Sequence, residues 1–144
     1  MKVEIKDDIR RIRRVLEIFK KEDFDSESSF YHSSGFPRGC CGDSTNLLGL
    51  FLKEDYGLDA FYVEATGLND DYQLSHAWLL VDDVIIDITA DQFADSNCEI
   101  EPVIITDSSD FHSSFNNVES YELNSDSLKN TAIANVLDKV RALM

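Results

Sequence analysis

The chain has 144 residues, carries 28 Asp and Glu against 13 Lys and Arg, and has a formal net charge of −15 at pH 7. The length predicts a single domain over residues 1–144, and 43% hydrophobic residues are enough to fill its core, which excludes wholesale disorder. Such a surface repels polyanions and anionic lipids, so nucleic acid and membranes are excluded as expected partners. No apolar run is as long as a signal peptide or a membrane span requires, and we expect a cytoplasmic protein.

The first segment, residues 1–22, is basic although the chain as a whole is acidic. It holds eight Lys and Arg against five Asp and Glu, whereas the remaining residues hold five against 23. Its apolar residues recur at steps of three and four, at Ile5, Ile9, Ile12, Leu16 and Phe19. We predict a basic amphipathic helix over residues 3–21 that docks on the acidic body, in preference to an arm that binds nucleic acid.

The middle of the chain predicts a loop, a helix and several strands. Residues 23–35 are rich in Ser, Asp and Gly without any period, which is typical of a loop. Residues 42–55 contain several closely spaced leucines and are followed by Gly57, a pattern that predicts a mostly buried helix. Short strands of an antiparallel sheet are predicted at residues 60–65, 77–81, 84–89 and 103–106.

The last third of the chain predicts one more helix. Residues 107–124 are aromatic and polar without a period, and we expect them to be irregular. Residues 125–144 predict a terminal helix, with Ser125 or Ser127 as its N-cap. The expected fold class is therefore α+β.

Two adjacent cysteines provide a candidate nucleophile. With Cys98 they form no disulfide framework, so we expect three free thiols. Gly39, Cys40, Cys41 and Gly42 lie at the start of the predicted helix. There the helix dipole and unpaired N–H groups stabilise a thiolate, and the glycines admit a substrate carbonyl. The alternative is that each cysteine is a small buried hydrophobe.

A predicted hairpin provides partners for the thiol. His76 lies in the first of two predicted strands, which are joined by a two-residue turn at Asp82-Asp83. Because side chains alternate along strands, His76 shares a face with Asp87 and is its diagonal neighbour, within hydrogen-bonding reach. The opposite face is wholly apolar and must be core, so the polar face needs its own cover. If the helix that begins near Cys41 supplies this cover, its thiol reaches the imidazole. This places nucleophile, base and orienting residue in the order Cys, His, Asp.

These residues resemble a known family. The run from Gly39 to Leu48 reads G-x-C-x-D-x-x-x-L-L, and His-Ala-Trp at 76–78 and Asp-x-Thr at 87–89 follow it. The combined pattern, within residues 36–93, is similar to the transglutaminase-like branch of the papain-like cysteine enzymes. The resemblance implies a fold in which the cysteine heads a helix packed on an antiparallel sheet, with the histidine and aspartate on neighbouring strands.

The resemblance also implies the roles of the residues. It maps the nucleophile onto Cys41, leaves Cys40 as a packing neighbour, and makes His76 the base that Asp87 orients. It implies acyl transfer from an amide without a metal or cofactor: peptide hydrolysis, deamidation or transfer to an amine. The substrate is a protein, peptide or small amide, expected to be neutral or cationic because residues 54–128 carry 18 acids and no Lys or Arg.

The sequence leaves the oxyanion-stabilising groups and the function class open. Residues 1–40 contain no Gln or Asn, so a donor could be the backbone N–H of Cys41, or a side chain at Tyr31, His32 or Gln92. For Gln92 a polar turn is the favoured interpretation. Two rival functions are a non-catalytic acidic module that binds proteins and a secreted effector or toxin deamidase.

Other polar residues carry weaker expectations. His32 and His112 lie in predicted loops and are expected to be exposed. Arg38 is either a substrate anchor or an ion-pair partner of local acids, and the ion pair is favoured. The acidic cluster within residues 87–95 is expected to be a solvated surface, because it lacks the pattern of a calcium loop. A zinc site built on the cysteines is disfavoured because no C-x-x-C spacing is present.

Overall fold

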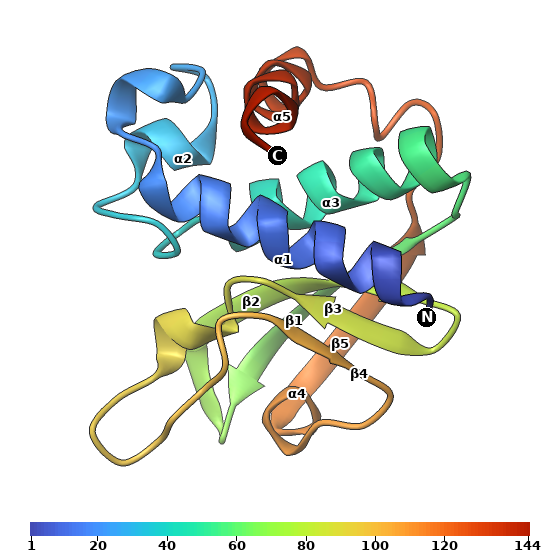
Figure 1. The fold of residues 1–144 in the computed structure, drawn as a ribbon. Coiled ribbons are helices and arrows are strands. Elements are labelled where there is room, and N and C mark those ends of the chain that lie inside the picture. Colours follow the sequence, from blue (N-terminus) through green and yellow to red (C-terminus); the bar gives the residue numbers. More distant parts are fainter.

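The computed structural model describes residues 1–144 as an antiparallel sheet with helices on both faces (Figure 1). The α-helices are α1 (Val3–Ile18), α2 (Ser29–His32), α3 (Cys41–Tyr56), α4 (Asp110–Ser113) and α5 (Thr131–Leu143). The strands are β1 (Phe61–Leu68), β2 (Asp71–Val81), β3 (Val84–Asp87), β4 (Ile104–Thr106) and β5 (Phe115–Glu122), and the 3₁₀ helices are η1 (Lys21–Asp23) and η2 (Ala90–Phe93). The strand order is β4-β3-β2-β1-β5. The predicted α+β class is confirmed.

The hairpin of β2 and β3 forms in the predicted register. Asp82 and Asp83 both have positive φ, 48° and 64°, the backbone of a tight turn whose twist matches its strands. Val81 pairs with Val84 across this turn. The alternation that was read from the sequence therefore holds along both strands.

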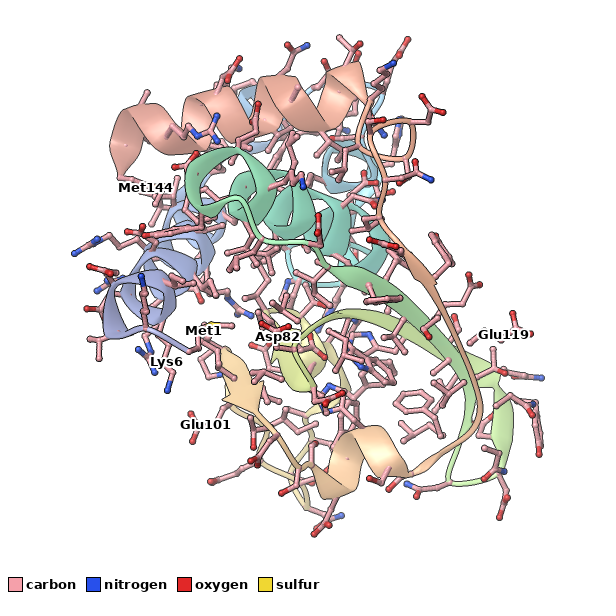
Figure 2. All side chains as sticks on the ribbon, turned by 90° about the vertical axis from the view of Figure 1, so that its right-hand side faces the viewer. Met1, Lys6, Asp82, Glu101, Glu119 and Met144 are labelled. Atoms are coloured by element: carbon pink, nitrogen blue, oxygen red, sulfur yellow. The ribbon has the colours of Figure 1, made fainter.

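The two faces of the sheet carry separate apolar clusters. Helices α1, α3 and α5 lie on one face of the sheet (Figures 1 and 2). They form the larger core, to which the hairpin contributes Leu79 and Ile86. The opposite face, that of Trp78, packs on Phe115 beside α4. The prediction that the helix beginning near Cys41 covers the polar face was wrong: α3 lies on the apolar face, because its leucines need apolar contacts, and only its first turn reaches the polar residues.

Both terminal helices are shorter than predicted. Helix α1 ends at Ile18, because Phe19 is extended and its ring packs on Phe24 at 5.4 Å between centroids. Helix α5 begins at Thr131, and its N-cap is Asn130, whose side chain accepts the N–H of Ile133. The predicted start at residue 125 was wrong, since the serines there lie in a turn that precedes the helix.

The segment 107–124 forms a short helix and a strand, and the prediction that it is irregular was wrong. Ser109 caps the short helix α4, and β5 then pairs along the whole length of β1. In β5 only Phe115 is buried, so this strand lacks the alternation that marks a half-buried strand in a sequence. The loop predicted at 23–35 likewise contains the single turn α2 and follows η1.

Helix α1 docks on the acidic body through a buried arginine, as the charge pattern predicted. Arg13 is 5% exposed and donates from its guanidinium to both carboxylate oxygens of Asp91, at 2.8 and 2.7 Å. It also donates to the carbonyls of Ile88 and Pro102 and to Glu17. The N-terminal helix therefore holds η2, the residue that follows β3 and the segment that precedes β4. None of the helices combines the length and apolar character that a membrane crossing requires.

Candidate active site

The two adjacent cysteines lie in different environments at the start of α3. Cys40 is fully buried, donates its thiol to the carbonyl of Arg38, and has a pKa that burial raises to about 11. Cys41 is half-buried and opens the helix, where backbone N–H groups have no partner within the helix. The Cys41 thiol is therefore the one that solvent and a substrate can reach.

His76 and Asp87 meet on the hairpin as its geometry predicts. The Nε2–H of His76 donates to Asp87 Oδ2 at 2.6 Å, and both side chains are almost completely buried. The other oxygen of Asp87, Oδ1, accepts the backbone N–H of Thr89 at 2.9 Å. The carboxylate thus orients the imidazole and leaves Nδ1 as the nitrogen that does not contact Asp87.

A second imidazole contacts the same carboxylate. His112 Nε2–H donates to Asp87 Oδ2 at 2.7 Å, and the His112 residue is 4% exposed. The expectation that His112 is exposed was wrong, because α4 folds back under the sheet and carries this side chain onto Trp78, 4.6 Å between ring centroids. The sequence around His112 has no hydrophobic period, so nothing in it indicated a contact with Asp87, which lies 25 residues earlier in the chain.

The buried pair shifts both pKa values. Burial lowers the pKa of His76, but the hydrogen bond and charge of Asp87, together with interactions with Cys41, outweigh it and raise the pKa to about 9. Burial alone would raise the pKa of Asp87, yet the hydrogen bonds from His112 and His76 hold it well below its ordinary range. Asp87 is therefore a carboxylate, and it favours the charged form of His76.

Gln92 joins the histidine to the loop that precedes α3. Its Oε1 accepts the backbone N–H of Gly39 at 3.4 Å, and its Nε2 lies 3.3 Å from His76 Nδ1. Because Asp87 occupies Nε2 of His76, Nδ1 is the nitrogen that faces Gln92 and is available to Cys41. Gln92 was favoured as a polar turn residue; it does lie in η2, and its side chain also belongs to the site.

Other candidates of the sequence lie outside the site. Arg38 is exposed and forms no ion pair, so its predicted pairing with local acids was wrong. His32 is exposed as predicted and donates to the carbonyl of Ser26, and the ring of Tyr31 lies against Lys21. Neither of these two side chains forms a hydrogen bond with His76, Asp87 or Gln92.

The acidic cluster within residues 87–95 is only partly a solvated surface. Asp87 is buried in the site and Asp91 is held by Arg13, whereas Asp95 is exposed. Sequence reasoning missed Arg13 as a residue of this region, although it stands on the apolar side of the helical pattern, next to Ile12. All three cysteines are free, and Cys98 is exposed.

A hollow of about 710 Å³ opens beside the site. Two residues of its wall, Phe93 and Phe111, also pack on the His76 ring, at 5.1 and 6.0 Å between centroids. Four carboxylates line it, and none of them takes part in an ion pair: Asp71, Asp95, Glu99 and Asp110. Its combination of apolar wall and acidic rim suits a group that carries a positive charge on an apolar stem.

Three side chains of the site also form a possible metal-ligand set. His76, Asp87 and His112 each offer one ligand atom, and these atoms lie within 4.8 Å of one another. Two imidazoles and a carboxylate suit zinc or iron. In the observed arrangement both Nε2 atoms donate to the carboxylate and so carry protons, which a metal ion would have to displace.

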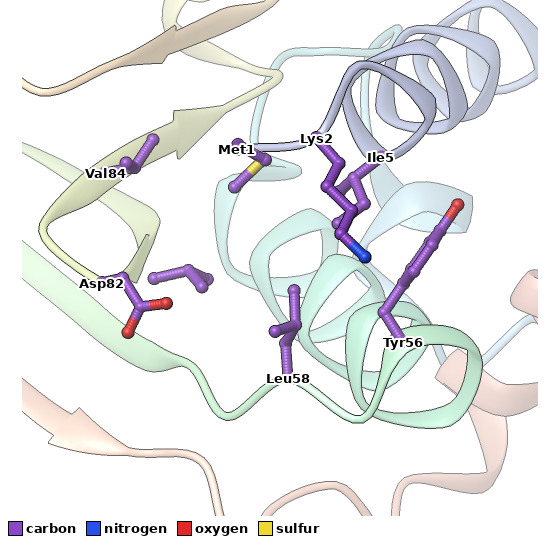
Figure 3. Close-up of a pocket in the computed structure, with 8 residues that line it drawn as sticks. Met1, Lys2, Ile5, Tyr56, Leu58, Asp82 and Val84 are labelled. Carbon is purple, nitrogen blue, oxygen red and sulfur yellow. The ribbon is translucent and has the colours of Figure 1, made fainter.

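A second, smaller cavity of about 220 Å³ lies at the other end of α3 (Figure 3). Met1 and Ile5 at the start of α1, Leu58 after α3, and Asp82 in the hairpin turn line it. The 16 residues of α3 separate this cavity from Cys41 by about 22 Å along the helix axis. It is not part of the candidate site.

No family model, curated protein or solved structure matches the chain. The function is therefore argued from the geometry of the site.

Proposed function

We propose that the protein is a cysteine enzyme that transfers or hydrolyses the acyl group of a carboxamide. In this proposal Cys41 is the nucleophile, His76 the general base and Asp87 the residue that orients His76. The observation that carries it is the buried His76 ring, which donates from Nε2 to Asp87 while its Nδ1 faces Gln92, the residue that binds Gly39 just before α3. We further propose that the chain belongs to the transglutaminase-like branch of the papain-like cysteine enzymes.

The reaction begins from a thiolate–imidazolium pair, in which the thiol proton of Cys41 lies on His76 Nδ1, because the raised pKa of His76 favours its charged form. The thiolate sulfur forms a bond to the carbonyl carbon of the substrate amide. The carbonyl π electrons move onto the oxygen, which the backbone N–H of Cys41 and the start of the helix stabilise. Asp87 stabilises the imidazolium that has formed.

The second half of the reaction returns the proton. His76 protonates the amide nitrogen, the carbon–nitrogen bond breaks, and a thioester remains on Cys41. His76 then deprotonates a water molecule or an amine, which attacks the thioester and releases the thiolate. Water gives hydrolysis or deamidation, and an amine gives acyl transfer.

Gln92 supports this proposal by the way its own carboxamide lies. Its oxygen accepts a backbone N–H, that of Gly39, and its nitrogen faces Nδ1 of His76. A substrate amide needs the same two contacts, an N–H donor for its oxygen and the base beside its nitrogen. The side chain of Gln92 therefore marks the position in which a carboxamide fits, and it has to swing aside when a substrate enters.

The charge around the site supports a neutral or cationic substrate. The hollow beside His76 has an apolar wall and four carboxylates without a cationic partner. A Lys or Arg side chain next to the reacting amide would place its stem on the wall and its charge at the rim. An acidic peptide would meet like charge there.

The proposal is tested by labelling and by product analysis. In a Cys98→Ser background, iodoacetamide near pH 6 should label Cys41 rapidly, because an ordinary thiol, with a pKa of about 8.5, is almost wholly protonated there. His76→Ala should abolish this rapid labelling. Peptides and glutamine-containing substrates, with and without an amine, are then analysed by mass spectrometry for cleaved, deamidated or amine-linked products.

The adjacent cysteine provides the matched control. Cys41→Ala and His76→Ala should abolish the turnover of any substrate found, whereas Cys40→Ala should retain most of it. An active Cys41→Ala protein would refute the proposal. If Cys41 in the folded protein is labelled no faster than an unactivated thiol, the chain is a non-catalytic binding module instead.

A further inference from the structure

The proposed reaction uses one histidine, but the carboxylate at its centre holds two. Asp87 Oδ2 accepts from His76 Nε2 at 2.6 Å and from His112 Nε2 at 2.7 Å. His112 comes from α4, on the opposite face of the sheet from α3, and its ring packs on Trp78. This second imidazole touches neither Cys41 nor the cavity beside the site.

The proton positions around His112 follow from its neighbours. A carboxylate only accepts hydrogen bonds, so His112 must carry its proton on Nε2. On the other side of the ring, Ser109 Oγ lies 2.6 Å from His112 Nδ1 and accepts the backbone N–H of His112 at 3.2 Å. A ring that carries its single proton on Nε2 has an acceptor at Nδ1, so the hydroxyl of Ser109 donates to it. Ser109 therefore holds His112 in the tautomer that donates to Asp87.

The second imidazole completes the hydrogen bonding of Asp87. Oδ1 accepts the backbone N–H of Thr89 at 2.9 Å and, more weakly, its hydroxyl at 3.4 Å, while Oδ2 accepts both imidazoles. A carboxylate offers about four acceptor positions, and all four are filled. Such a carboxylate cannot rotate without losing a bond, and it is a weak base toward the proton of His76.

We propose that His112, held by Ser109, is a positioning residue that fixes Asp87 against His76 and so sets the proton affinity of the base. The inference rests on the proposed function of Cys41 and His76. The functional unit then runs from the thiol through His76 and Asp87 to His112. A buried histidine that served packing alone would need neither a donor aimed at the carboxylate nor a serine that sets its tautomer.

Variants of His112 separate positioning from packing. His112→Gln keeps an N–H near the position of Nε2, whereas His112→Leu fills a similar volume without a donor. In the Cys98→Ser background, we expect His112→Leu to lower the labelling rate of Cys41 by iodoacetamide near pH 6 by about tenfold, the effect of losing one hydrogen bond to a charged group. His112→Gln should restore most of the rate, and exposed His32→Ala should leave it unchanged.

The pH profile of labelling identifies the cause. In His112→Leu, the rise of the labelling rate with pH should move toward that of an ordinary thiol, because His76 loses a rigid partner. If the profile of His112→Leu matches that of the parent protein, the inference is wrong while the proposed function stands. If the parent protein itself shows no His76-dependent labelling, the proposed function is wrong.

A measurement without core substitutions covers the case in which His112→Leu fails to fold. In ¹⁵N–¹H spectra of the intact protein, we expect His76 and His112 both to be protonated on Nε2, and Ser109→Ala to release His112 from that tautomer. An Nδ1-protonated His112 in the intact protein would overturn the inference. So would the binding of one equivalent of Zn²⁺ with loss of both Nε2–H signals, because the cluster would then be a metal site.

Discussion

At the scale of single residues, the hydrogen bonds of Asp87 make the stability of the site depend on the protonation states of Asp87 and His76. The carboxylate is 2% exposed and His76 is 3% exposed, so neither charge is compensated by water. Each depends on the other for its charged form. A change of pH that neutralises one partner must therefore destabilise the folded protein as well as the site.

The raised pKa of His76 predicts a loss of stability at alkaline pH. Unfolded histidine has a pKa of about 6.5, and the folded residue has a pKa of about 9. The folded protein binds this proton more tightly, so the stabilisation is complete below about pH 6.5 and is lost as the pH rises through about 9. At about 1.4 kcal/mol for each pKa unit, the loss amounts to at most about 3 kcal/mol.

Urea unfolding between pH 5 and pH 10 measures this loss, with His76→Gln as the control. The variant should be less stable near neutral pH and should lack the alkaline decline. For Asp87 the sign is opposite: its pKa is lowered, so its contribution is present above about pH 4 and is lost in acid. Equal alkaline slopes in both proteins would contradict the assignment to His76.

At the scale of elements, Arg13 joins the first helix to the turn that carries Gln92. Its side chain is 7% exposed and binds Asp91, the residue before Gln92, with two hydrogen bonds. Two carbonyls, of Ile88 and Pro102, depend on the same guanidinium. Removing it leaves buried acceptors without a donor.

We predict that Arg13→Met destabilises the protein by about 3 kcal/mol, the cost of breaking a buried ion pair from one side. Arg10→Met is the matched control, because Arg10 is 52% exposed and pairs only with Asp7 on the same helix, a contact that contributes less than about 1 kcal/mol. Thermal or urea unfolding of both variants measures the difference. Similar losses in the two variants would show that the contacts of Arg13 contribute little.

The hairpin was predictable from the sequence because its information is local. Two aspartates in a two-residue turn fix the register, and strict alternation separates the face of His76 from that of Leu79. The pairing of His76 with Asp87 follows from these two facts alone. The start of α3 at Cys41 was within one residue of the predicted start, because glycines precede the run of leucines.

The missed parts depend on contacts between distant residues. Strand β5 exposes every residue but Phe115 and is held by backbone pairing to β1, which leaves no pattern in its side chains. His112 stands on a single helical turn, and its partner Asp87 is 25 residues away. The docking of α3 on the apolar face was also missed, since the sequence does not say which face of a hairpin a helix covers.

At the scale of the whole molecule, the negative charge surrounds the site. The stretch from residue 54 to 128 supplies β1 to β5 and carries 18 acids and no Lys or Arg. Arg13 is a base of the N-terminal helix that reaches this region, and Asp91 and Glu17 pair with it. A charged molecule that approaches Cys41 therefore meets a field that is dominated by carboxylates.

This field predicts a preference among small alkylating agents. Neutral iodoacetamide should react with Cys41 faster than anionic iodoacetate, relative to the same ratio for a small free thiol. The preference should shrink as salt rises from about 0.02 to 0.5 M, because the screening length falls well below 10 Å. Rates measured by mass spectrometry in the Cys98→Ser background test this, and a preference for iodoacetate that does not change with salt would contradict it.

The spread of the site along the chain has a consequence for biosynthesis. Cys41 is made 71 residues before His112, which at about 5–20 residues per second is an interval of about 4 to 14 seconds. Until the end of that interval the contact of His112 with Asp87 cannot form, and β5, which follows His112, cannot yet pair with β1. The proposed unit of Cys41, His76, Asp87 and His112 therefore assembles only when most of the domain has been made.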